Sequence, residues 1–343
     1  MSEIFRVGIT RDILDSRGEP AFGRAALAIL DDAPHVEWEY LPDRVNAIDA
    51  SHAAAYDAIY VNTPRVTADA VAGADCRLRV VARHGVGYDS VDVPAMTAAG
   101  VIVTNTPSAM PRPVATIALT FMLSLAGRLF EKDRLTRTGR WHERMDRMGI
   151  GLTGRTLGVV GAGRIGKELL RMARTFDMQL VAADPHVHAV ELGYLGARKV
   201  PLDELMRTSD FVVVCCLLDA GTRHLIGERE FAQMRRDAFF INVARGPIVD
   251  ERALIAALVE RRIAGAAVDV FEQEPVDPAN PLLAMDNVIV TPHSLCWTDE
   301  CFHNMATIGL ASIVDVLARR RPHFVVDPAV LDHPRVRSWL TAS

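Results

Sequence analysis

Three side chains that can carry acid–base or anion chemistry each follow a late apolar run in the sequence. They are Arg245, Glu274 and His293. A guanidinium can hold a carboxylate or a carbonyl oxygen through two hydrogen bonds at once. An imidazole titrates near neutral pH and can pass a proton to a carbonyl oxygen, and a carboxylate beside it would fix its tautomer and favour its protonated form. Because parallel strands end at one edge of a sheet, we expect the three side chains to converge there.

Each of these residues has a commoner structural explanation when it is considered alone. Arg245 precedes a Gly-Pro pair and could cap a turn, while His293 follows a proline and could bond to backbone. A glutamate before a proline, as at Glu274, is usually a loop residue. The combination of all three at strand ends is what favours a catalytic site.

A glycine-rich turn between an apolar run and an amphipathic segment predicts a dinucleotide site. The turn is Gly161-Ala-Gly163-Arg-Ile-Gly166, and Asp184 ends the next apolar run. Gly161 allows a tight turn, Gly163 lets backbone N–H groups approach a pyrophosphate, and Gly166 lets the helix pack closely on the strand. The helix N-terminus would attract the phosphates. Asp184 would accept hydrogen bonds from the adenosine ribose and repel a 2′-phosphate, so we expect NAD, with NADP less favoured.

The composition bounds the class of protein. The chain has 343 residues, is half hydrophobic and carries a net charge of -5. This length favours two domains, and the charge argues against a nucleic-acid partner. The longest apolar run, 114–126, is too short and interrupted to span a bilayer, and the N-terminus does not resemble a signal peptide. Five scattered cysteines form neither a disulfide framework nor a zinc pattern, so we expect a cytoplasmic protein without a metal site.

The order of apolar runs predicts an α/β protein with parallel sheets. Strand-like and helical runs alternate over the first hundred residues and again from residue 156 onward. The strand-like runs are 6–10, 36–40, 56–61, 78–82, 101–104, 156–160, 180–183, 211–215, 238–243, 265–270 and 287–291. Between the two series, a helix should begin near Ser108 and continue through Leu129, crossing from one domain to the other.

Together these motifs resemble those of the D-isomer-specific 2-hydroxyacid dehydrogenase family. The matching motifs are the glycine turn, Asn242-Val-Ala-Arg-Gly246, Asp269-Val-Phe-Glu-Gln-Glu-Pro275 and Thr291-Pro-His293. The resemblance covers nearly the whole chain. It implies two doubly wound domains, with an NAD-binding Rossmann domain (107–295) inserted into a flavodoxin-like substrate domain (1–106 and 296–343). It also implies a homodimer that transfers a hydride between NAD and C2 of a small (R)-2-hydroxy or 2-oxo acid.

The same resemblance implies roles for individual residues. Arg245 would bind substrate, His293 would be the acid/base and Glu274 its partner. Val86 and Gly87 would present backbone N–H groups to the substrate carboxylate. Asp269 would bind the nicotinamide carboxamide. The full set of expected cofactor contacts is Gly161, Gly163, Arg164, Ile165, Gly166, Asp184, Val243, Ala244 and Asp269.

Two segments depart from the family pattern and leave the identity of the acid and the physiological direction open. The family often has polar residues where this chain has Met110-Pro111-Arg112-Pro113, and Arg112 is a candidate second anion contact for the substrate. Trp297 follows His293 where small residues are usual, and it could shape the pocket or pack on the last helix. A different class of function, an NAD(H)-sensing binding protein similar to the corepressors that share this fold, is the alternative.

Overall fold

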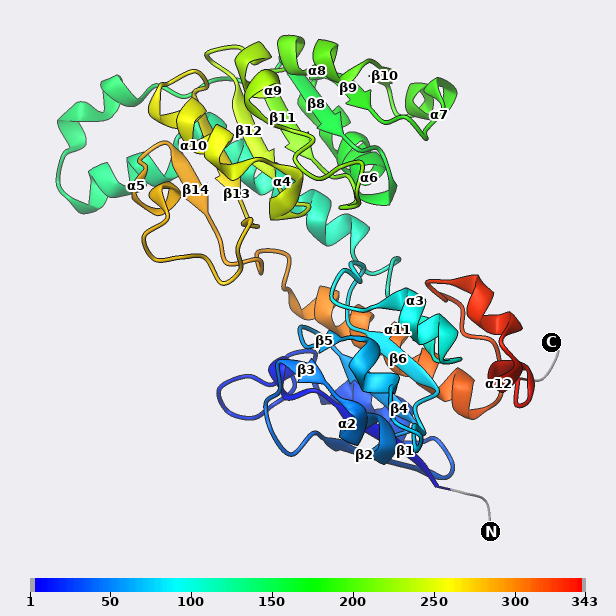
Figure 1. The fold of residues 1–343 in the computed structure, drawn as a ribbon. Helices are drawn as coiled ribbons and strands as arrows, with labels where there is room; N and C mark the ends of the chain where they lie inside the picture. The colour runs from blue at the N-terminus through cyan, green and yellow to red at the C-terminus, as the bar shows by residue number, and fades with distance from the viewer. Residues whose placement is uncertain (1–3, 341–343) are drawn as a thin grey trace. The chain divides into compact units, whose positions relative to one another are not determined.

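The computed structural model describes residues 4–340, which form two compact units (Figure 1). Unit 1 consists of the described residues up to Met110 and from Trp297 onward, and unit 2 is Pro111–Cys296. Unit 2 therefore interrupts the sequence of unit 1.

Unit 1 is built on a five-stranded parallel sheet with the order β2-β1-β4-β6-β7. Counted among themselves, these strands have the 2-1-3-4-5 order of a flavodoxin-like sheet. Their bounds are β1 (Phe5–Ile9), β2 (Val36–Tyr40), β4 (Ala58–Val61), β6 (Val80–Arg83) and β7 (Ile102–Thr104). A separate two-stranded sheet pairs β3 (Ala47–Ile48) with β5 (Arg65–Val66).

Helices cover both faces of the unit 1 sheet, because alternate strand residues are apolar on each side. Tyr60 of β4 points to the face covered by α11, whereas Ile59 points to the face covered by α2 and α3. The helices are α1 (Ala28–Asp31), α2 (Ala50–Ala55), α3 (Val93–Ala98), α11 (Asp299–Leu317) and α12 (Pro334–Arg337), with 3-10 turns η1 (Arg11–Ile13), η2 (Arg24–Leu27), η3 (Ala68–Val71) and η8 (Pro328–Asp332).

Unit 2 contains a seven-stranded parallel sheet with the order β10-β9-β8-β11-β12-β13-β14. This is the doubly wound order of a Rossmann fold, whose strand order reverses between β8 and β11. The bounds are β8 (Thr156–Val160), β9 (Gln179–Ala183), β10 (Ala197–Lys199), β11 (Phe211–Val214), β12 (Phe239–Asn242), β13 (Gly265–Val268) and β14 (Val288–Val290).

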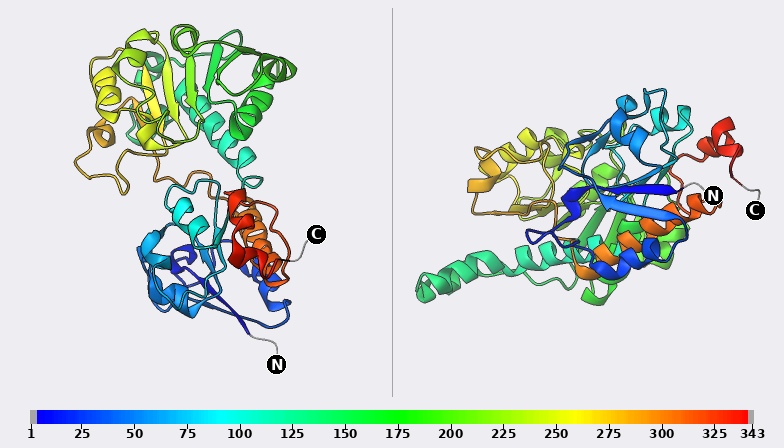
Figure 2. Two further views of the ribbon diagram at one scale, coloured as in Figure 1. Left: turned by 45° about the vertical axis from the view of Figure 1, so that its right-hand side comes forward. Right: turned by 90° about the horizontal axis from the view of Figure 1, so that it is seen from below.

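The unit 2 sheet lies between two helical layers (Figure 2). The helices α4 (Pro111–Gly127) and α6 (Arg164–Ala173) pack against each other, and α4 also packs on β12 and β13. The other face is covered by α8 (Leu202–Thr208), α9 (Glu228–Gln233) and α10 (Glu251–Val259). The remaining elements are α5 (Leu129–Arg137), α7 (Ala189–Tyr194), η4 (Trp141–Arg147), η5 (Arg174–Phe176), η6 (Gly246–Ile248) and η7 (Pro281–Ala284).

The helix predicted from near Ser108 through Leu129 is shorter than expected. It is α4, which begins at Pro111 because proline is accommodated only in the first turn of a helix. It ends at Gly127, since Arg128 has a φ of 51° in the left-handed region and α5 continues at an angle of 57°. Among the described residues, no single helix has the length and composition to cross a membrane, and α4 and α5 reach both only as a bent pair.

Candidate functional site

The glycine turn connects β8 to α6, as the sequence predicted. Gly161 has a φ of 88°, and a Cβ on it would lie 2.5 Å from the backbone nitrogen of Cys216. A Cβ on Gly166 would lie 2.2 Å from the carbonyl oxygen of Gly161. Gly163 differs, because no atom lies within 4 Å of its Cβ position. The fold therefore requires Gly161 and Gly166, whereas Gly163 leaves open space beside the N-terminus of α6. Helix N-termini with such space are typical phosphate-binding sites, and the contact of this turn with a pyrophosphate stays a prediction.

Asp184, directly after β9, fixes the conformation of this turn. Its Oδ2 accepts a hydrogen bond of 2.7 Å from the N–H of Ala162, and its Oδ1 accepts one of 2.8 Å from the N–H of His186. From the sequence we predicted that Asp184 contacts the cofactor ribose, but not that it also holds the backbone of the turn through these hydrogen bonds. A carboxylate has about four lone-pair positions, so these two bonds leave capacity for ribose hydroxyls.

His293 and Glu274 lie together after β14 and β13. The distance between His293 Nδ1 and Glu274 Oε2 is 2.7 Å, and the side chains are 41% and 36% exposed. His293 has a φ of 53°, a conformation that is uncommon outside glycine and that the surrounding loop must hold. With Nδ1 engaged by the carboxylate, Nε2 is the nitrogen that can exchange a proton with a ligand.

The electrostatics of this pair favour a charged carboxylate. Burial raises the pKa of Glu274, but the hydrogen bond and charge of His293, the N–H of Phe271 and the charge of Arg245 outweigh it. The pKa of Glu274 therefore lies below its ordinary value, and its negative charge is available to stabilise an imidazolium. Because β12 and β13 are neighbouring parallel strands, the turn that carries Arg245 and the loop that carries Glu274 leave the same edge of the sheet.

A second histidine–glutamate pair in unit 2 was not recognised from the sequence. The Nε2 of His224 lies 2.5 Å from Oε1 of Glu272, and His224 also has a positive φ, of 52°. The other oxygen of Glu272 accepts a bond from the N–H of Glu251, the first residue of α10. This pair is therefore tied to the start of a helix. Glu272 lies within the Asp269–Pro275 motif, but no motif marks its partner His224.

Asp269 organises the loop that carries His293. Its Oδ1 accepts bonds from the Thr291 hydroxyl (2.5 Å) and from the N–H groups of Ser294 (3.2 Å) and Leu295 (3.3 Å). Burial raises the pKa of Asp269, although these hydrogen bonds and the charge of His293 oppose the shift. The loop-holding role was missed from the sequence, which suggested only a nicotinamide contact.

Arg245 follows β12 in a turn that Asn242 holds. The Nδ2 of Asn242 donates to the carbonyl of Arg245, and its Oδ1 accepts from the N–H of Ala244, both at 3.0 Å. The Nη1 of Arg245 donates to the Ala244 carbonyl at 2.8 Å. Val243 and Ala244, both expected near the cofactor, lie in the same turn. The positioning role of Asn242, the last residue of β12, is another contribution that sequence reasoning did not assign.

Val86 and Gly87 belong to unit 1, in the loop that follows β6. The carbonyl of Val86 accepts a bond of 2.8 Å from Nδ2 of Asn105. Just before the loop, His84 is buried and bonds to the Tyr60 hydroxyl. Burial, reinforced by the charge of Arg83, lowers the pKa of His84 to about 3, so this side chain is neutral at physiological pH. The loop is thus well anchored, and the role of its N–H groups toward a substrate stays a prediction.

The two departures from the family pattern have defined surroundings. Arg112, in the first turn of α4, places Nη1 3.1 Å from Glu168 of α6, so its contact is with a neighbouring helix; its role toward substrate stays a prediction. The Trp297 ring centre lies 5.1 Å from that of Phe302 in an edge-on contact. One of the two alternatives for Trp297, packing on the last long helix, is therefore observed.

Comparison with known proteins identifies the family of this chain. Residues 119–294 match the model described as D-isomer specific 2-hydroxyacid dehydrogenase, NAD binding domain. This chain belongs to that family. A glyoxylate reductase of Aeropyrum pernix is 35% identical to this chain over 336 residues, which cover 95% of this chain and 97% of the reductase. A D-3-phosphoglycerate dehydrogenase of Methanocaldococcus jannaschii is 39% identical over 254 residues, 74% of this chain but 48% of that one.

Solved structures agree with this assignment. The TT0316 protein of Thermus thermophilus has a TM-score of 0.82 and 29% identity, covering 94% of this chain and 100% of that chain. The predictions of the family, of the fold class and of an oxidoreductase with a nicotinamide cofactor and a 2-hydroxy or 2-oxo acid substrate are confirmed. The enzymes among these relatives favour a dehydrogenase over the NAD(H)-sensing binding protein.

Proposed function

We propose that this dehydrogenase uses NADH to reduce a small, unphosphorylated 2-oxo acid to the (R)-2-hydroxy acid, with His293 as the proton donor. The observation that carries the proposal is the 2.7 Å contact between His293 Nδ1 and Glu274 Oε2. An imidazole paired at one nitrogen with a carboxylate can deliver a proton from the other. The size of the acid is suggested by the glyoxylate reductase of Aeropyrum pernix, which aligns over 97% of its length.

Different residues of unit 2 bind the cofactor, bind the substrate and transfer the proton in this mechanism. The nicotinamide, when bound, supplies a hydride to C2 of the acid. The turn from Gly161 to Gly166 and the N-terminus of α6 hold the pyrophosphate, and Asp184 accepts bonds from the ribose. Arg245 holds an oxygen of the substrate through its planar fork. His293 Nε2 gives a proton to the carbonyl oxygen, and Glu274 stabilises the imidazolium beforehand.

Oxidation of NADH with a panel of 2-oxo acids tests the proposed substrate. The panel contains glyoxylate, hydroxypyruvate, pyruvate and a phosphorylated hydroxypyruvate. We expect the highest kcat/KM among the three unphosphorylated acids, with at least about a tenfold margin, or about 1.4 kcal/mol in transition-state binding. A higher kcat/KM for the phosphorylated acid would contradict the proposed substrate. Absence of turnover with every acid would contradict the proposed activity.

Asp184 should determine the preference for NADH over NADPH. A 2′-phosphate beside its carboxylate is repelled, by about 4 kcal/mol at a separation of 4 Å and an effective dielectric constant of about 20. Asp184→Asn keeps an oxygen acceptor for the turn but removes the charge. We expect the ratio of kcat/KM for NADH to that for NADPH to fall at least about tenfold.

A matched control for Asp184 lies at the other end of the same strand. Asp177→Asn makes the same change of charge at an exposed position just before β9. It should leave the cofactor ratio unchanged. If both variants change the ratio equally, the general charge of unit 2 and not Asp184 governs the preference.

Glu274 should set the alkaline limit of 2-oxo acid reduction. Its pKa lies below the ordinary value, so the carboxylate is charged wherever histidines titrate. Glu274→Gln removes that charge, and the imidazolium of His293 then loses its proton more readily. Since reduction requires the protonated form, the fall in kcat/KM at high pH should begin about one pH unit lower.

The pair formed by His224 and Glu272 provides a control for the pH profile. Glu272→Gln removes the same charge beside His224, and it should leave the alkaline limit of reduction in place. The rate of oxidation, which requires neutral His293, should extend to lower pH in Glu274→Gln. A pH profile of Glu274→Gln that coincides with the wild type would exclude the proposed partnership.

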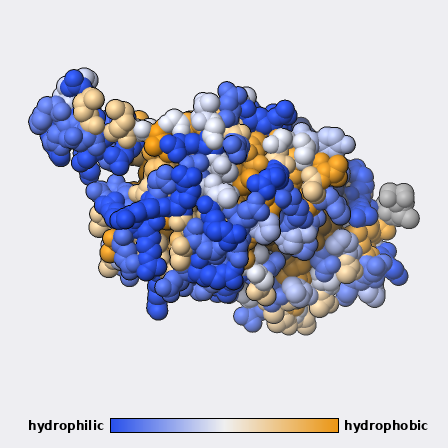
Figure 3. Space-filling model, turned by 90° about the horizontal axis from the view of Figure 1, so that it is seen from above, coloured by the Kyte–Doolittle hydropathy of each residue, from blue (hydrophilic) through white to orange (hydrophobic). Residues whose placement is uncertain are grey.

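The expected homodimer is proposed to form through the segment that contains α5 and η4. This segment stands away from the unit 2 sheet in Figure 2, and in Figure 3 it carries hydrophobic residues among mainly hydrophilic ones. The exposed apolar side chains on or beside it are Leu129, Phe130, Trp141, Met145 and Met148. Such side chains on a projecting segment suit burial against a second copy. Light scattering after size-exclusion chromatography should give twice the chain mass, and a monomer at micromolar concentration would refute the dimer.

A further inference from the structure

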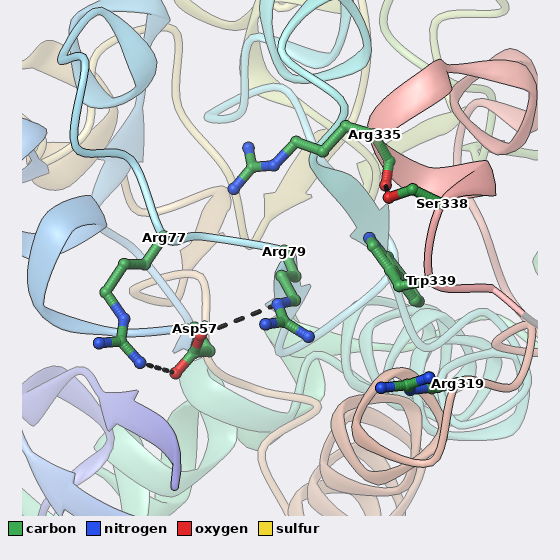
Figure 4. Close-up of a pocket in the computed structure, with 7 residues that line it drawn as sticks. All are labelled: Asp57, Arg77, Arg79, Arg319, Arg335, Ser338 and Trp339. Carbon is green, nitrogen blue, oxygen red and sulfur yellow. Dashed lines mark hydrogen bonds and ion pairs between the residues drawn. The ribbon is translucent and has the colours of Figure 1, made fainter. Parts of the chain in front are cut away.

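A cavity of about 390 Å³ in unit 1 is surrounded by arginines. We call it the arginine pocket, and Figure 4 shows how its side chains gather from separate segments. Its lining includes Arg77, Arg79, Arg319, Arg335, Asp57 and Trp339. The cavity has the volume of a small-molecule site.

The arginine pocket carries an excess of positive charge. Asp57 is the acidic residue in its described lining, and its side chain is 3% exposed. Its Oδ2 accepts a bond of 3.0 Å from Nη2 of Arg77, and its Oδ1 lies 3.8 Å from Nε of Arg79. One carboxylate is therefore shared by two guanidinium groups, which leaves the lining net positive.

The other two arginines add further positive charge to the lining. Arg335 donates from Nη1 to the carbonyl of Ala99 at 3.2 Å and from Nη2 to the carbonyl of Cys76 at 2.8 Å. These neutral acceptors hold the guanidinium in place but do not cancel its charge. Arg319 lies two residues beyond the end of α11 and is exposed.

The side chains surround a space with a cationic centre and a flat apolar wall. In Figure 4, Arg79 lies between Asp57 on one side and Trp339 with Arg319 on the other. Arg79 is also held over the Phe5 ring, with its Cζ 5.8 Å from the ring centre. Its guanidinium is thus oriented before any ligand arrives, and its side chain is still 31% exposed.

We propose that the arginine pocket binds a small phosphate-bearing anion, inorganic phosphate or a phosphate monoester. Guanidinium groups match the oxygens of a phosphate through paired hydrogen bonds, and a dianion offsets the repulsion among the clustered charges. Arg79 and Arg319 hold the phosphate oxygens. Trp339 offers its ring to the organic part of a monoester, because an indole face packs well against a small apolar body.

The arginine pocket is separate from the loop expected to contact the substrate. Arg77 and Arg79 precede the amino end of β6, whereas Val86 and Gly87 follow its carboxyl end. A strand of this length, Val80–Arg83, places the Cα atoms of its first and last residues about 10 Å apart. A phosphate in the pocket therefore acts as a second ligand of the enzyme, and this inference does not depend on which acid is reduced.

Calorimetric titration of the whole enzyme with inorganic phosphate, in chloride buffer, tests the pocket. We expect binding at one site, weakened at least about tenfold in the double variant Arg79→Gln, Arg319→Gln. Arg320→Gln is the matched control, since Arg320 bonds to Asp315 at 2.8 Å and does not line the pocket. Arg245→Gln separates this site from the proposed substrate site. Both controls should bind phosphate as the wild type does.

Three results would overturn the proposal. They are absence of phosphate binding by the wild type, equal binding by the double variant, and loss of binding in Arg320→Gln or Arg245→Gln. If the double variant does not fold, as judged by circular dichroism, Arg319→Gln alone at the exposed position decides, with an expected loss of at least about threefold. Titration with glycerol 3-phosphate distinguishes the source of the phosphate. If glycerol 3-phosphate binds more tightly than inorganic phosphate, and Trp339→Ala removes this difference, the natural ligand is a monoester. If glycerol 3-phosphate binds more weakly, the ligand is inorganic phosphate.

Discussion

Replacement of His293 by alanine should lower kcat for 2-oxo acid reduction about 1,000-fold, which corresponds to about 4 kcal/mol of transition-state stabilisation. The methyl group cannot deliver the proton that the carbonyl oxygen needs as the hydride arrives. Binding of NADH should change little, because the glycine turn and Asp184 hold the cofactor by other contacts. The measurement is kcat and KM with the best acid of the panel, together with the Kd for NADH from fluorescence.

The second histidine–glutamate pair gives a closely matched control for this variant. His224 is 45% exposed, bonds to Glu272 at 2.5 Å and has a positive φ, as His293 does. His224→Ala should therefore reproduce any general effect of losing such a pair while retaining wild-type kcat. If His293→Ala retains wild-type turnover, or if the two variants lose activity equally, His293 is not the acid/base.

Alanine at Gly163 should weaken cofactor binding without lowering stability, whereas alanine at Gly166 should lower the stability of unit 2. At Gly163 a methyl group enters open space beside the start of α6, so it should weaken NADH binding about tenfold or more without unfolding unit 2. At Gly166 the methyl group would lie 2.2 Å from the carbonyl oxygen of Gly161, and the helix must shift away from the strand. Overpacking of this kind costs about 1–3 kcal/mol or more.

Thermal unfolding and NADH titration separate the two glycines. For Gly163→Ala we expect an unchanged Tm and a raised Kd. For Gly166→Ala we expect a Tm lower by several degrees, with about 2–4 °C for each kcal/mol in a domain of this size. Gly151→Ala, a second glycine with open space at its Cβ position but outside the turn, is the control and should change neither quantity. A loss of stability in Gly163→Ala would contradict the view that ligand binding, rather than folding, requires this glycine.

Much of the architecture could be predicted because it depends on local sequence patterns. The glycine turn after β8 and the acid after β9 determine a dinucleotide-binding unit wherever they occur in that order. Each predicted apolar run is a strand to within a few residues, since each is bounded by polar or glycine positions. The short strands β3, β5 and β10 were not predicted, because they contain only two or three residues. The helix after Thr106 was placed less well. The prolines of residues 105–113 indicated a start near Ser108, but they did not show that Pro111 is the first helical residue. No signal in the sequence marked the left-handed residue Arg128.

The sequence by itself determined the fold class and named the side chains at the strand ends, because in a parallel sheet every strand delivers its last residue to the same edge. Only the tertiary structure decided which of these side chains meet. The contacts of His293 with Glu274, of Asp269 with Thr291 and of Arg112 with Glu168 join residues 19, 22 and 56 positions apart. The arginine pocket joins segments still more distant in the sequence. Periodicity and spacing describe one segment at a time, whereas these contacts depend on how separate segments pack together.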